Sequence, residues 1–452
     1  MEMALERELK LDADAAFELP PDLGEPLESR LFTSTYYDTP IRSLLRSGIT
    51  LRRRVERGLS HWQLKLPRDD GREELEAAGG PAGPPDDLRR LLTAHLRHGA
   101  LGPVATLRTR RAGYRVADHG RPVADVTLDA VDVLEGQRQA GAFRELEVEL
   151  VDGGDHDLDR LGKILRRAGA RRSDGRSKLM RVLPLEDGPA DPYGLRAQLQ
   201  QLERHDPGVR LGDDAEDLHR FRVATRRTRA IVRATRPLLG DLLTPLSGDL
   251  AWLAGVLGPV RDLDVLIDRL RVEVAALDAD ASAGDELVAT LEEQRARHRD
   301  VLLEALDSQR YVELLARFER DIEGVEAGGD VVALAAKAFK RLRRDARALG
   351  KDPDDESVHV LRKTAKKARY AAELVDDRKV ARYVAALKEL QDVVGVHQDA
   401  VVAEGQLREI ARARTAVAAG RLIASERARR RDAREALKPA LDAALARGEK
   451  AF

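Results

Sequence analysis

The sequence predicts a two-domain α+β protein. We expect an N-terminal eight-stranded antiparallel β tunnel or barrel with flanking helices, and a C-terminal all-α pair of four-helix bundles with pseudo-two-fold symmetry. Three observations predict this fold: polar and apolar residues alternate up to about residue 183, the period then becomes helical, and the helical part repeats its own motifs. A length of 452 residues also favours more than one core.

The N-terminal part reads as about eight strands, for example LERELKL, GITLRRRVER and FRELEVELV. Charged residues share one face of several strands, as Glu6, Glu8 and Lys10 do. Such a face is either the wet side of a half-exposed sheet or the lining of a barrel. Because acids and bases occur on separate strands, the set as a whole favours a lining that holds a polyanion together with metal ions.

The Pro/Gly/Asp-rich stretch PLEDGPADPY reads as a linker. We therefore expect a first domain at residues 1–185, a linker at 186–194 and a helical domain at 195–452. Within the helical domain, repeat units are expected at about 195–325 and 326–452.

The helical part contains two matching basic segments, HRFRVATRRTRA at 219–230 and HVLRKTAKKARY at 359–370. A second pair, LGPVRDLDVL at 257–266 and VGVHQDAVVA at 394–403, follows in the same order. It aligns Arg261 with Gln398 and Asp262 with Asp399. Two pairs in one order indicate duplicated units of about four helices each.

Helical spacing gives each basic segment a stripe of cations. His219 is followed by Arg222, Arg226 and Arg229 at i+3, i+7 and i+10, and the stripe is ~15 Å long. We assign Phe221, Val223 and Ile231 to the core. A solvated basic face is the plain alternative for one such stripe, but duplication at matched positions favours a phosphate-rich ligand. Nucleic acid is disfavoured because the helical part has few aromatic residues to stack on bases. The segment KAFKRLRRDARAL at 337–349 either widens this patch or is a solvated face.

Composition excludes several classes of site. The chain has no cysteine, which excludes disulfides, thiolate zinc sites and cysteine nucleophiles. No apolar run approaches the ~20 residues of a membrane span, and the start does not read as a signal peptide. We expect a cytoplasmic protein that does not bind membranes. The net charge of -1 predicts no partner, so local patches carry that argument.

With these motifs in view, residues 192–450 resemble a CHAD domain, the conserved histidine α-helical module. The resemblance implies two four-helix bundles whose basic central face binds inorganic polyphosphate. The residues that it implies for binding are His219, Arg222, Arg226, Arg227, Arg229, His359, Arg362, Lys366, Lys367 and Arg369.

The N-terminal part resembles the CYTH family, the triphosphate tunnel metalloenzymes. Glu6, Glu8 and Lys10 match an E-x-E-x-K signature, and TYYDTP, GITLRRR, WQLKLP, REELE, ADVTLD, ELEVE and RSKL follow in the family's order. One departure lies in LRTRRAGY, where Thr109 occupies a position at which the family often has lysine. Arg108 or Arg110 is expected to substitute there. Asp38, at the end of a strand, is expected to have a structural role.

The CYTH resemblance implies a divalent-metal-dependent triphosphatase that acts on inorganic triphosphate or a related triphosphate. The implied triphosphate-binding residues are Lys10, Arg52, Arg54, Lys65, Arg111 and Lys178. The implied ligands of Mg²⁺ or Mn²⁺ are Glu6, Glu8, Glu147 and Glu149, with Glu145 and Asp129 as further candidates. Glu74, Glu76 and Asp125 are expected as additional tunnel acids. Two alternatives stay open: an adenylate cyclase of the tunnel-fold class, and a non-enzymatic polyphosphate-binding or granule-associated protein. The preferred metal and the oligomeric state also stay open.

Overall fold

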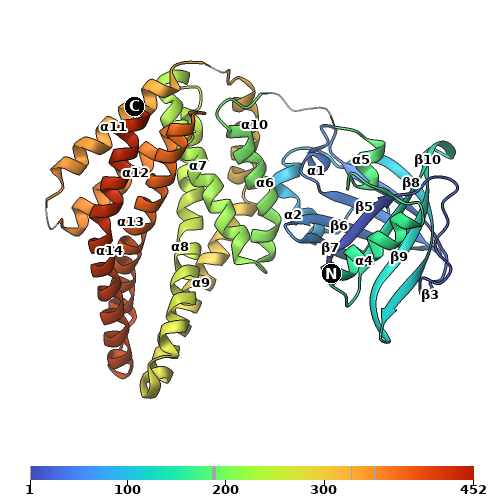
Figure 1. Cartoon of the computed structure of the whole chain (residues 1–452), viewed down its shortest axis with the longest axis horizontal. Helices are drawn as coiled ribbons and strands as arrows, with labels where there is room; N and C mark the ends of the chain where they lie inside the picture. Colours follow the sequence, from blue (N-terminus) through green and yellow to red (C-terminus); the bar gives the residue numbers. More distant parts are fainter. Residues whose placement is uncertain (1, 186–189, 327, 351–352) are drawn as a thin grey trace. The chain divides into compact units, whose positions relative to one another are not determined.

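The computed structural model describes residues 2–185, 190–326, 328–350 and 353–452. The chain separates into two compact units, Met1–Gly188 and Pro189–Phe452 (Figure 1). Of the expected linker 186–194, residues 186–189 lie outside the described residues.

The N-terminal unit is an antiparallel sheet that closes on itself. Its strands are β1 (Glu2–Glu6), β2 (Glu8–Asp12), β3 (Glu25–Pro26), β4 (Arg30–Asp38), β5 (Thr50–Glu56), β6 (Leu59–Arg68), β7 (Gly71–Ala78), β8 (Gly102–Asp118), β9 (Arg121–Glu135), β10 (Arg138–Leu150) and β11 (Arg171–Arg172). The order is β1-β7-β6-β5-β4-β8-β9-β10-β2-β11, and β3 pairs with β8.

Closure follows from the two ends of this order. Strand β1 pairs with β7 and β2 pairs with β10, yet β1 and β2 are one stretch of chain interrupted only at Arg7. Counting that stretch once, and leaving aside the two-residue strands β3 and β11, the described residues give eight strands. The expected eight-stranded antiparallel barrel is therefore confirmed.

The barrel is patterned with its apolar side outward. In β10, Leu146 and Val148 are fully buried and pack with Leu161 and Leu165 of α4 (Asp155–Arg167). The alternating residues Glu145, Glu147 and Glu149 must point to the other face, into the barrel. The apolar core thus lies outside the wall, and the charged residues are left to line the interior. The unit's other helices are α1 (Ser43–Arg46), α2 (Asp86–Leu91), α3 (Thr93–Leu96) and α5 (Lys178–Val182).

Helix α5 and an apolar cluster bound part of the barrel interior. Tyr36, Leu107 and Val131 lie on the inward side of their strands and pack with Leu45 and Leu179. The Ser177 side chain caps α5 by accepting a hydrogen bond from the Met180 backbone NH at 3.2 Å. This cap places Lys178 on the first turn of the helix, where its side chain is buried.

The C-terminal unit is entirely helical. Its first half contains α6 (Leu195–Leu211), α7 (Ala215–Leu239), α8 (Thr244–Val274), α9 (Ala281–Asp307) and α10 (Gln309–Glu323), with the short 3₁₀ turn Asp278–Asp280 before α9. Its second half contains α11 (Val331–Ala348), α12 (Asp355–Ala372), α13 (Arg378–Ile410) and α14 (Ala416–Ala451), with the short 3₁₀ turn Ala413–Thr415 before α14. No helix in the described ranges is long and apolar enough to cross a membrane.

The two halves follow the same plan with one difference. The long helix α14 corresponds in order to α9 and α10 together, because the first half is interrupted at Ser308, whose hydroxyl caps α10. The second half has its own core, which includes Leu361 and Tyr383. A further core joins the halves, with Leu270 of α8 and Leu291 of α9 in one cluster with Leu407 of α13 and Leu422 of α14. Helices α7 and α12, which carry the two basic segments, are in contact.

Candidate functional site

The strand register places charged residues of facing strands side by side inside the barrel. Glu147 of β10 is directly opposite Lys10 of β2, and Lys65 of β6 is opposite Glu74 of β7. Arg111 of β8 is opposite Asp129 of β9. Cross-strand neighbours lie ~5 Å apart, so these pairs are built by the register alone.

Three cations surround Glu147. Its Oε1 accepts from Lys10 Nζ at 2.7 Å and from Lys178 Nζ at 2.6 Å, and its Oε2 accepts from Arg111. Burial alone would raise the pKa of Glu147, but Lys10, Lys178 and Arg111 hold it well below its usual range. The carboxylate is therefore fixed as an anion in the centre of a cationic cluster.

Two more buried acids complete this cluster. Lys178 Nζ also donates to Glu145 at 2.6 Å and lies 3.0 Å from Asp129. Arg111 makes a two-pronged contact with Asp129, with both N–O distances at 2.7 Å. Asp129 and Glu145 are fully buried. Both were candidate metal ligands, and here both are hydrogen-bonded to cations.

A second cluster lies on β1, β5, β6 and β7. Lys65 Nζ contacts Glu6 at 2.5 Å and Glu74 at 3.2 Å. Arg52 donates to Gln63 at 2.7 Å and to the hydroxyl of Tyr36 at 3.3 Å. Gln63 in turn donates to Glu76. Glu74 and Glu76 therefore contact the inward side chains Lys65 and Gln63 of β6.

Arg54 is the exception among the interior cations. It is 7% exposed, its Nε has no hydrogen-bond partner, and it forms no ion pair within the described residues. Its guanidinium lies over the ring of Phe32, 3.5 Å from the centroid. Burial, Arg52 and Arg111 lower the pKa of Arg54 to about 9, so the group is a cation at neutral pH. Arg54 is therefore a buried cation on which two other cations, Arg52 and Arg111, exert the strongest electrostatic effects.

Glu149 is the acidic counterpart of Arg54, because it is a carboxylate inside the barrel without an ion pair among the described residues. It makes no hydrogen bond or ion pair in the described part of the chain, and burial together with Glu6 raises its pKa to about 7. In this structure the described residues form no group of three acids or histidines spaced to hold a metal ion. The donor chemistry nevertheless fits: Glu6, Glu8 and Glu149 supply hard carboxylate oxygens, and Glu149 makes no ion pair within the described residues.

Most of the other residues singled out in the barrel also have clear positions. Asp125 lies at the margin and pairs with Arg115 at 2.8 Å. Asp38 is buried and accepts from the backbone NH groups of Thr39, Leu44 and Leu45, which confirms a structural role. The expectation for Arg108 and Arg110 is wrong: both are exposed, on the face of β8 opposite Arg111. Alternation gives the physical reason, because a neighbour in a strand cannot replace an inward residue.

Sequence reasoning missed four interior or rim residues. Tyr36 and Gln63 orient Arg52, Arg30 contacts Glu56 at 2.6 Å, and Arg181 lies 3.0 Å from Glu145. A signal was present for two of them. Arg30 shares the inward parity of β4 with Tyr36, and Arg181 is one helical turn beyond Lys178.

In the helical unit the two basic segments occupy equivalent environments. The burial of residues 221–230 and 361–370 repeats position for position. Arg222 forms an ion pair with Asp262 of α8 at 2.8 Å. At the matching position of the second half, the charge of Asp399 of α13 acts to raise the pKa of Arg362, against the effect of burial. His359 Nδ1 lies 2.9 Å from Gln398, while burial and Arg261, at the matching position, lower the pKa of His219. In both halves, residues of the second repeated motif (257–266 and 394–403) therefore act on residues of the basic segments (219–230 and 359–370).

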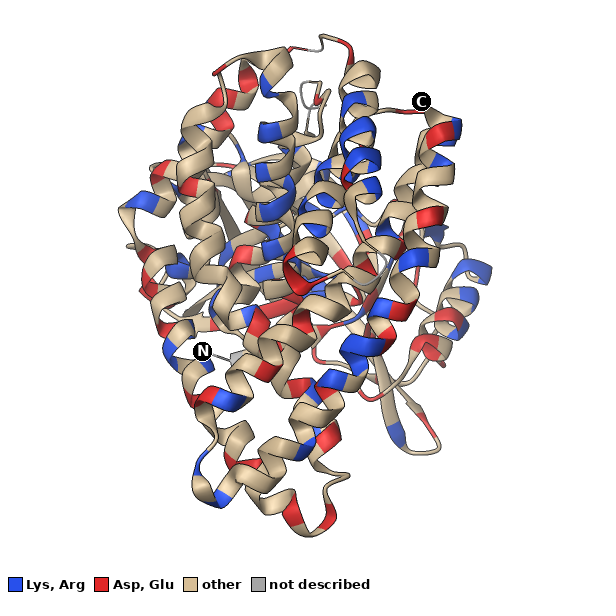
Figure 2. Ribbon diagram, turned by 90° about the vertical axis from the view of Figure 1, so that its left-hand side faces the viewer, with Lys and Arg blue, Asp and Glu red and all other residues tan. Residues whose placement is uncertain are grey.

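Because α7 and α12 are in contact, we call their two stripes together the central stripe. Figure 2 shows bands of Lys and Arg gathered along the helices near the centre of its view. Burial, then Arg226 of α7 and Arg362 of its own helix, lower the pKa of Lys366 to about 7. Lys366 forms no ion pair in the described ranges. Asp262 is one acidic partner of the stripe, and Glu373 is another, 3.5 Å from Arg369 and 3.3 Å from Arg227, which lies next to the stripe. Val223 does not belong to the core as expected, because it is 42% exposed.

These features define a class: a protein with a β barrel lined by acids and bases, and a duplicated helical unit with a single-sign cationic surface. The sequence matches the family model described as CYTH domain over residues 4–181, and the one described as CHAD domain over residues 194–408. Two proteins of Mycobacterium tuberculosis, from strains CDC 1551 and H37Rv and both named uncharacterized, are 32% identical to this chain over 423 residues. Each comparison covers 83% of this chain and 81% of the relative.

Some solved structures resemble the helical unit of this chain, and others resemble its barrel. The CHAD domain of Ricinus communis is 26% identical, covering 56% of this chain and 90% of that domain with a TM-score of 0.47. PptA of Streptomyces chartreusis is 25% identical, covering 55% and 96% with a TM-score of 0.45. A Hippeastrum protein, whose name couples adenylyl cyclase with a dominant triphosphatase activity, is 20% identical, covering 42% and 100% with a TM-score of 0.26.

This chain therefore belongs to the family of proteins in which a CYTH domain precedes a CHAD domain. The CYTH family includes triphosphatases and adenylate cyclases, and its tunnel enzymes generally use divalent metal ions.

Proposed function

We propose that the barrel is a divalent-metal-dependent triphosphatase, acting on inorganic triphosphate or a related triphosphate, and that the helical unit binds inorganic polyphosphate. The observation that carries the first half is Arg54, a buried guanidinium without an acidic partner among the cations of the interior. A bound phosphate supplies the negative charge and the acceptor oxygens that this group lacks.

The other interior cations have a different part in the proposal. Lys10, Lys178 and Arg111 are held in place by Glu147, Glu145 and Asp129, so their positions are fixed before a substrate enters. Cations fixed in advance stabilise the charge that develops on a leaving phosphate oxygen without reorganising during the reaction. Arg52, oriented by Gln63 and Tyr36, and Lys65, held by Glu6, extend this lining around the wall.

Glu6, Glu8 and Glu149 would hold the Mg²⁺ or Mn²⁺ ion. When bound there, the ion would neutralise phosphate oxygens and lower the pKa of a bound water. Glu147 is a weaker candidate than the sequence suggested, because its two oxygens are already shared by three cations. We propose that Glu147 positions Lys10, Lys178 and Arg111.

The polyphosphate half of the proposal is supported by the repulsion within the central stripe. Arg222, Arg226, Arg362 and Lys366 come from two helices in contact, and burial together with the charges of the three arginines lowers the pKa of Lys366 to about 7. A linear polyanion laid along α7 and α12 relieves that repulsion. Association with polyphosphate granules belongs to this proposal.

The test is an activity panel on the full chain. Inorganic triphosphate, ATP and thiamine triphosphate are each incubated with Mg²⁺ or Mn²⁺, and phosphate and cyclic AMP are measured. We expect metal-dependent phosphate release that is lost in Glu6→Ala and Glu8→Ala. Cyclic AMP as the main product from ATP would favour the cyclase alternative. Absence of turnover for all substrates, with the Glu variants indistinguishable from wild type, would leave only a binding protein.

A further inference from the structure

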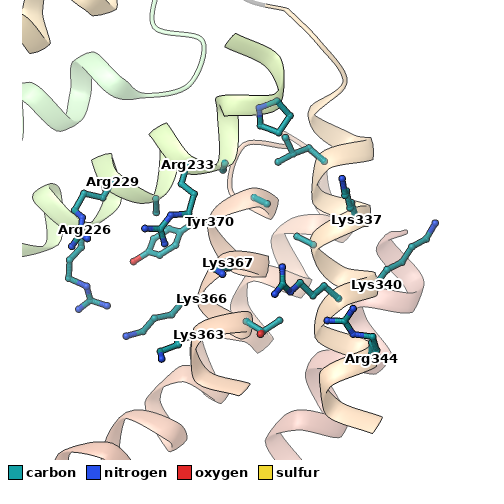
Figure 3. A pocket seen from close by; sticks show the side chains of 18 residues that line it. Arg226, Arg229, Arg233, Lys337, Lys340, Arg344, Lys363, Lys366, Lys367 and Tyr370 are labelled. Carbon is teal, nitrogen blue, oxygen red and sulfur yellow. The ribbon is translucent and has the colours of Figure 1, made fainter. Parts of the chain in front are cut away.

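A large cavity lies beside the central stripe, between α7, α11 and α12. Its volume is ≈ 920 Å³, and we call it the α11 pocket (Figure 3). Ten of its 18 described lining residues are Lys or Arg and none is Asp or Glu. The ten are Arg226, Arg229, Arg233, Lys337, Lys340, Arg341, Arg344, Lys363, Lys366 and Lys367. Three of them, Arg226, Arg229 and Lys366, also belong to the four-residue stripes of α7 and α12.

The charge of this pocket is largely uncompensated. Among the described residues, Arg344 is the one lining cation with an ion-pair partner within 4 Å, Asp345 at 2.9 Å. Burial, then Arg341 of α11 and Arg233 of α7, lower the pKa of Lys367. Burial and Arg233 likewise lower the pKa of Arg229. Cations on three helices thus face a common space, and this arrangement requires an anion to offset their repulsion.

Apart from Thr364 and the hydroxyl of Tyr370, the rest of the lining is apolar, which a purely inorganic anion does not explain. The remaining residues include Ala230, Ala234, Leu334, Ala338 and Ala371. Tyr370 lies among the cations, with the Arg369 guanidinium 4.7 Å from its ring centroid (Figure 3). An aromatic ring next to apolar helix surface accepts a flat organic group, and aromatic stacking of a base is sequence-tolerant.

We propose that the α11 pocket binds a nucleoside triphosphate, with its phosphates on the Lys and Arg rim and its base against Tyr370 and the alanine floor. This goes beyond the proposed function, since it adds a nucleotide site in the helical unit. It does not depend on polyphosphate binding by the central stripe, because Lys337, Lys340 and Arg341 of α11 lie outside that stripe.

The experiment uses the full chain in EDTA, so that ATP is not turned over. Photolabelling with 8-azido-ATP, followed by peptide mapping, separates the pocket from the barrel, which also has cations. We expect label on peptides of α7, α11 or α12, protection by excess ATP, and weaker protection by inorganic triphosphate. Label confined to residues 2–185 would overturn the proposal.

Two variants then separate phosphate from base recognition. Lys340→Glu with Arg341→Glu should reduce labelling at least tenfold, while Arg347→Glu, an exposed α11 residue outside the lining, should not. Tyr370→Leu should weaken protection by ATP about tenfold and leave protection by triphosphate unchanged. Equal protection by ATP and triphosphate, unaltered by Tyr370→Leu, would contradict a base site.

A third variant separates this inference from the proposed function. Arg222→Glu with Arg362→Glu should abolish polyphosphate binding while the photolabel of the α11 pocket persists. Loss of the pocket label in this variant, with circular dichroism unchanged, would show that the pocket is only a part of the stripe.

Discussion

The barrel and the central stripe differ in what surrounds their cations: acids surround most of those in the barrel, and other cations surround those of the stripe. In the barrel, carboxylates on facing strands pair with Lys10, Lys178 and Arg111. Within the part of the barrel that the structure describes, Arg54 and Glu149 form no ion pair. On α7 and α12, cations face cations, and acids such as Asp262 and Glu373 lie at the margins. Fixed groups of both signs suit metal-assisted chemistry, whereas a surface of one sign suits binding alone.

The largest effect is expected from Arg54. Replacing it with alanine removes the interior cation that has no internal partner, and we expect phosphate release from triphosphate to fall by roughly 10²–10³-fold in kcat, the size typical of losing one preorganised charge donor. Arg53→Ala, on the outward side of the same strand, is the matched control and should retain near wild-type activity. Similar rates for both variants would remove the distinction between inward and outward residues.

Glu149→Gln tests the acidic side of the barrel. It keeps the size of the side chain and removes one hard anionic ligand, so the metal concentration for half-maximal activity should rise roughly 10–100-fold. A metal titration at fixed substrate measures it. The control is Asp125→Asn, at the barrel margin and already paired with Arg115. An unchanged metal requirement in Glu149→Gln would remove Glu149 from the proposed metal site.

Because of Lys366, we expect the polyphosphate affinity of the central stripe to depend on pH. The lysine's pKa of about 7 is set by burial and by Arg226 and Arg222 from α7, with Arg362 and Arg369 from α12. Bound phosphate favours the charged lysine and raises this pKa. Polyphosphate affinity is therefore full below pH 7 and should fall by up to about tenfold per pH unit above it.

The substitution Lys366→Arg should flatten this pH profile, because arginine stays charged throughout. Lys438→Arg, on an exposed helix face and paired with Asp442, should not alter it. A wild-type profile that is already flat between pH 6.5 and 8.5 would rule out the lysine as the titrating group.

The smallest effect is expected from Glu373, the acid that offsets part of the positive charge at the end of the central stripe. Glu373→Gln frees Arg227 and Arg369 from their partly buried partner, so polyphosphate affinity should increase only about threefold, the size of one weak ion pair. The steepness of the affinity against salt concentration should increase as well. Weaker binding in this variant would mean that Glu373 orders the two arginines.

Sequence alone was sufficient for the arrangement of charges along each element. Period two assigned Glu145, Glu147 and Glu149 to one face, and helical spacing assigned Arg222 and Arg226 to one stripe. It could not show which charges are already paired, because pairing depends on strand register and on where α5 packs. Glu147 therefore read as a metal ligand although three cations share it. Arg54 was predicted as one cation among several, although among the described cations of the barrel interior it is the one without an ion pair.

The α11 pocket shows the same limit in the helical unit. The basic run of α11 was visible in the sequence, but its meeting with Arg233 of α7 and Lys363 of α12 depends on helix packing. The prediction that Val223 belongs to the core was wrong for a related reason: a hydrophobic residue next to a cationic stripe need not face the core.

The most direct test of the division of labour measures two readouts on the same preparations: metal-dependent phosphate release from triphosphate, and long-chain polyphosphate affinity at fixed salt. Arg54→Ala should lose turnover and keep polyphosphate affinity, while Arg222→Glu with Arg362→Glu should lose polyphosphate affinity and keep turnover. If each variant lost both readouts, or neither, chemistry in the barrel and binding on the helices would not be separate functions.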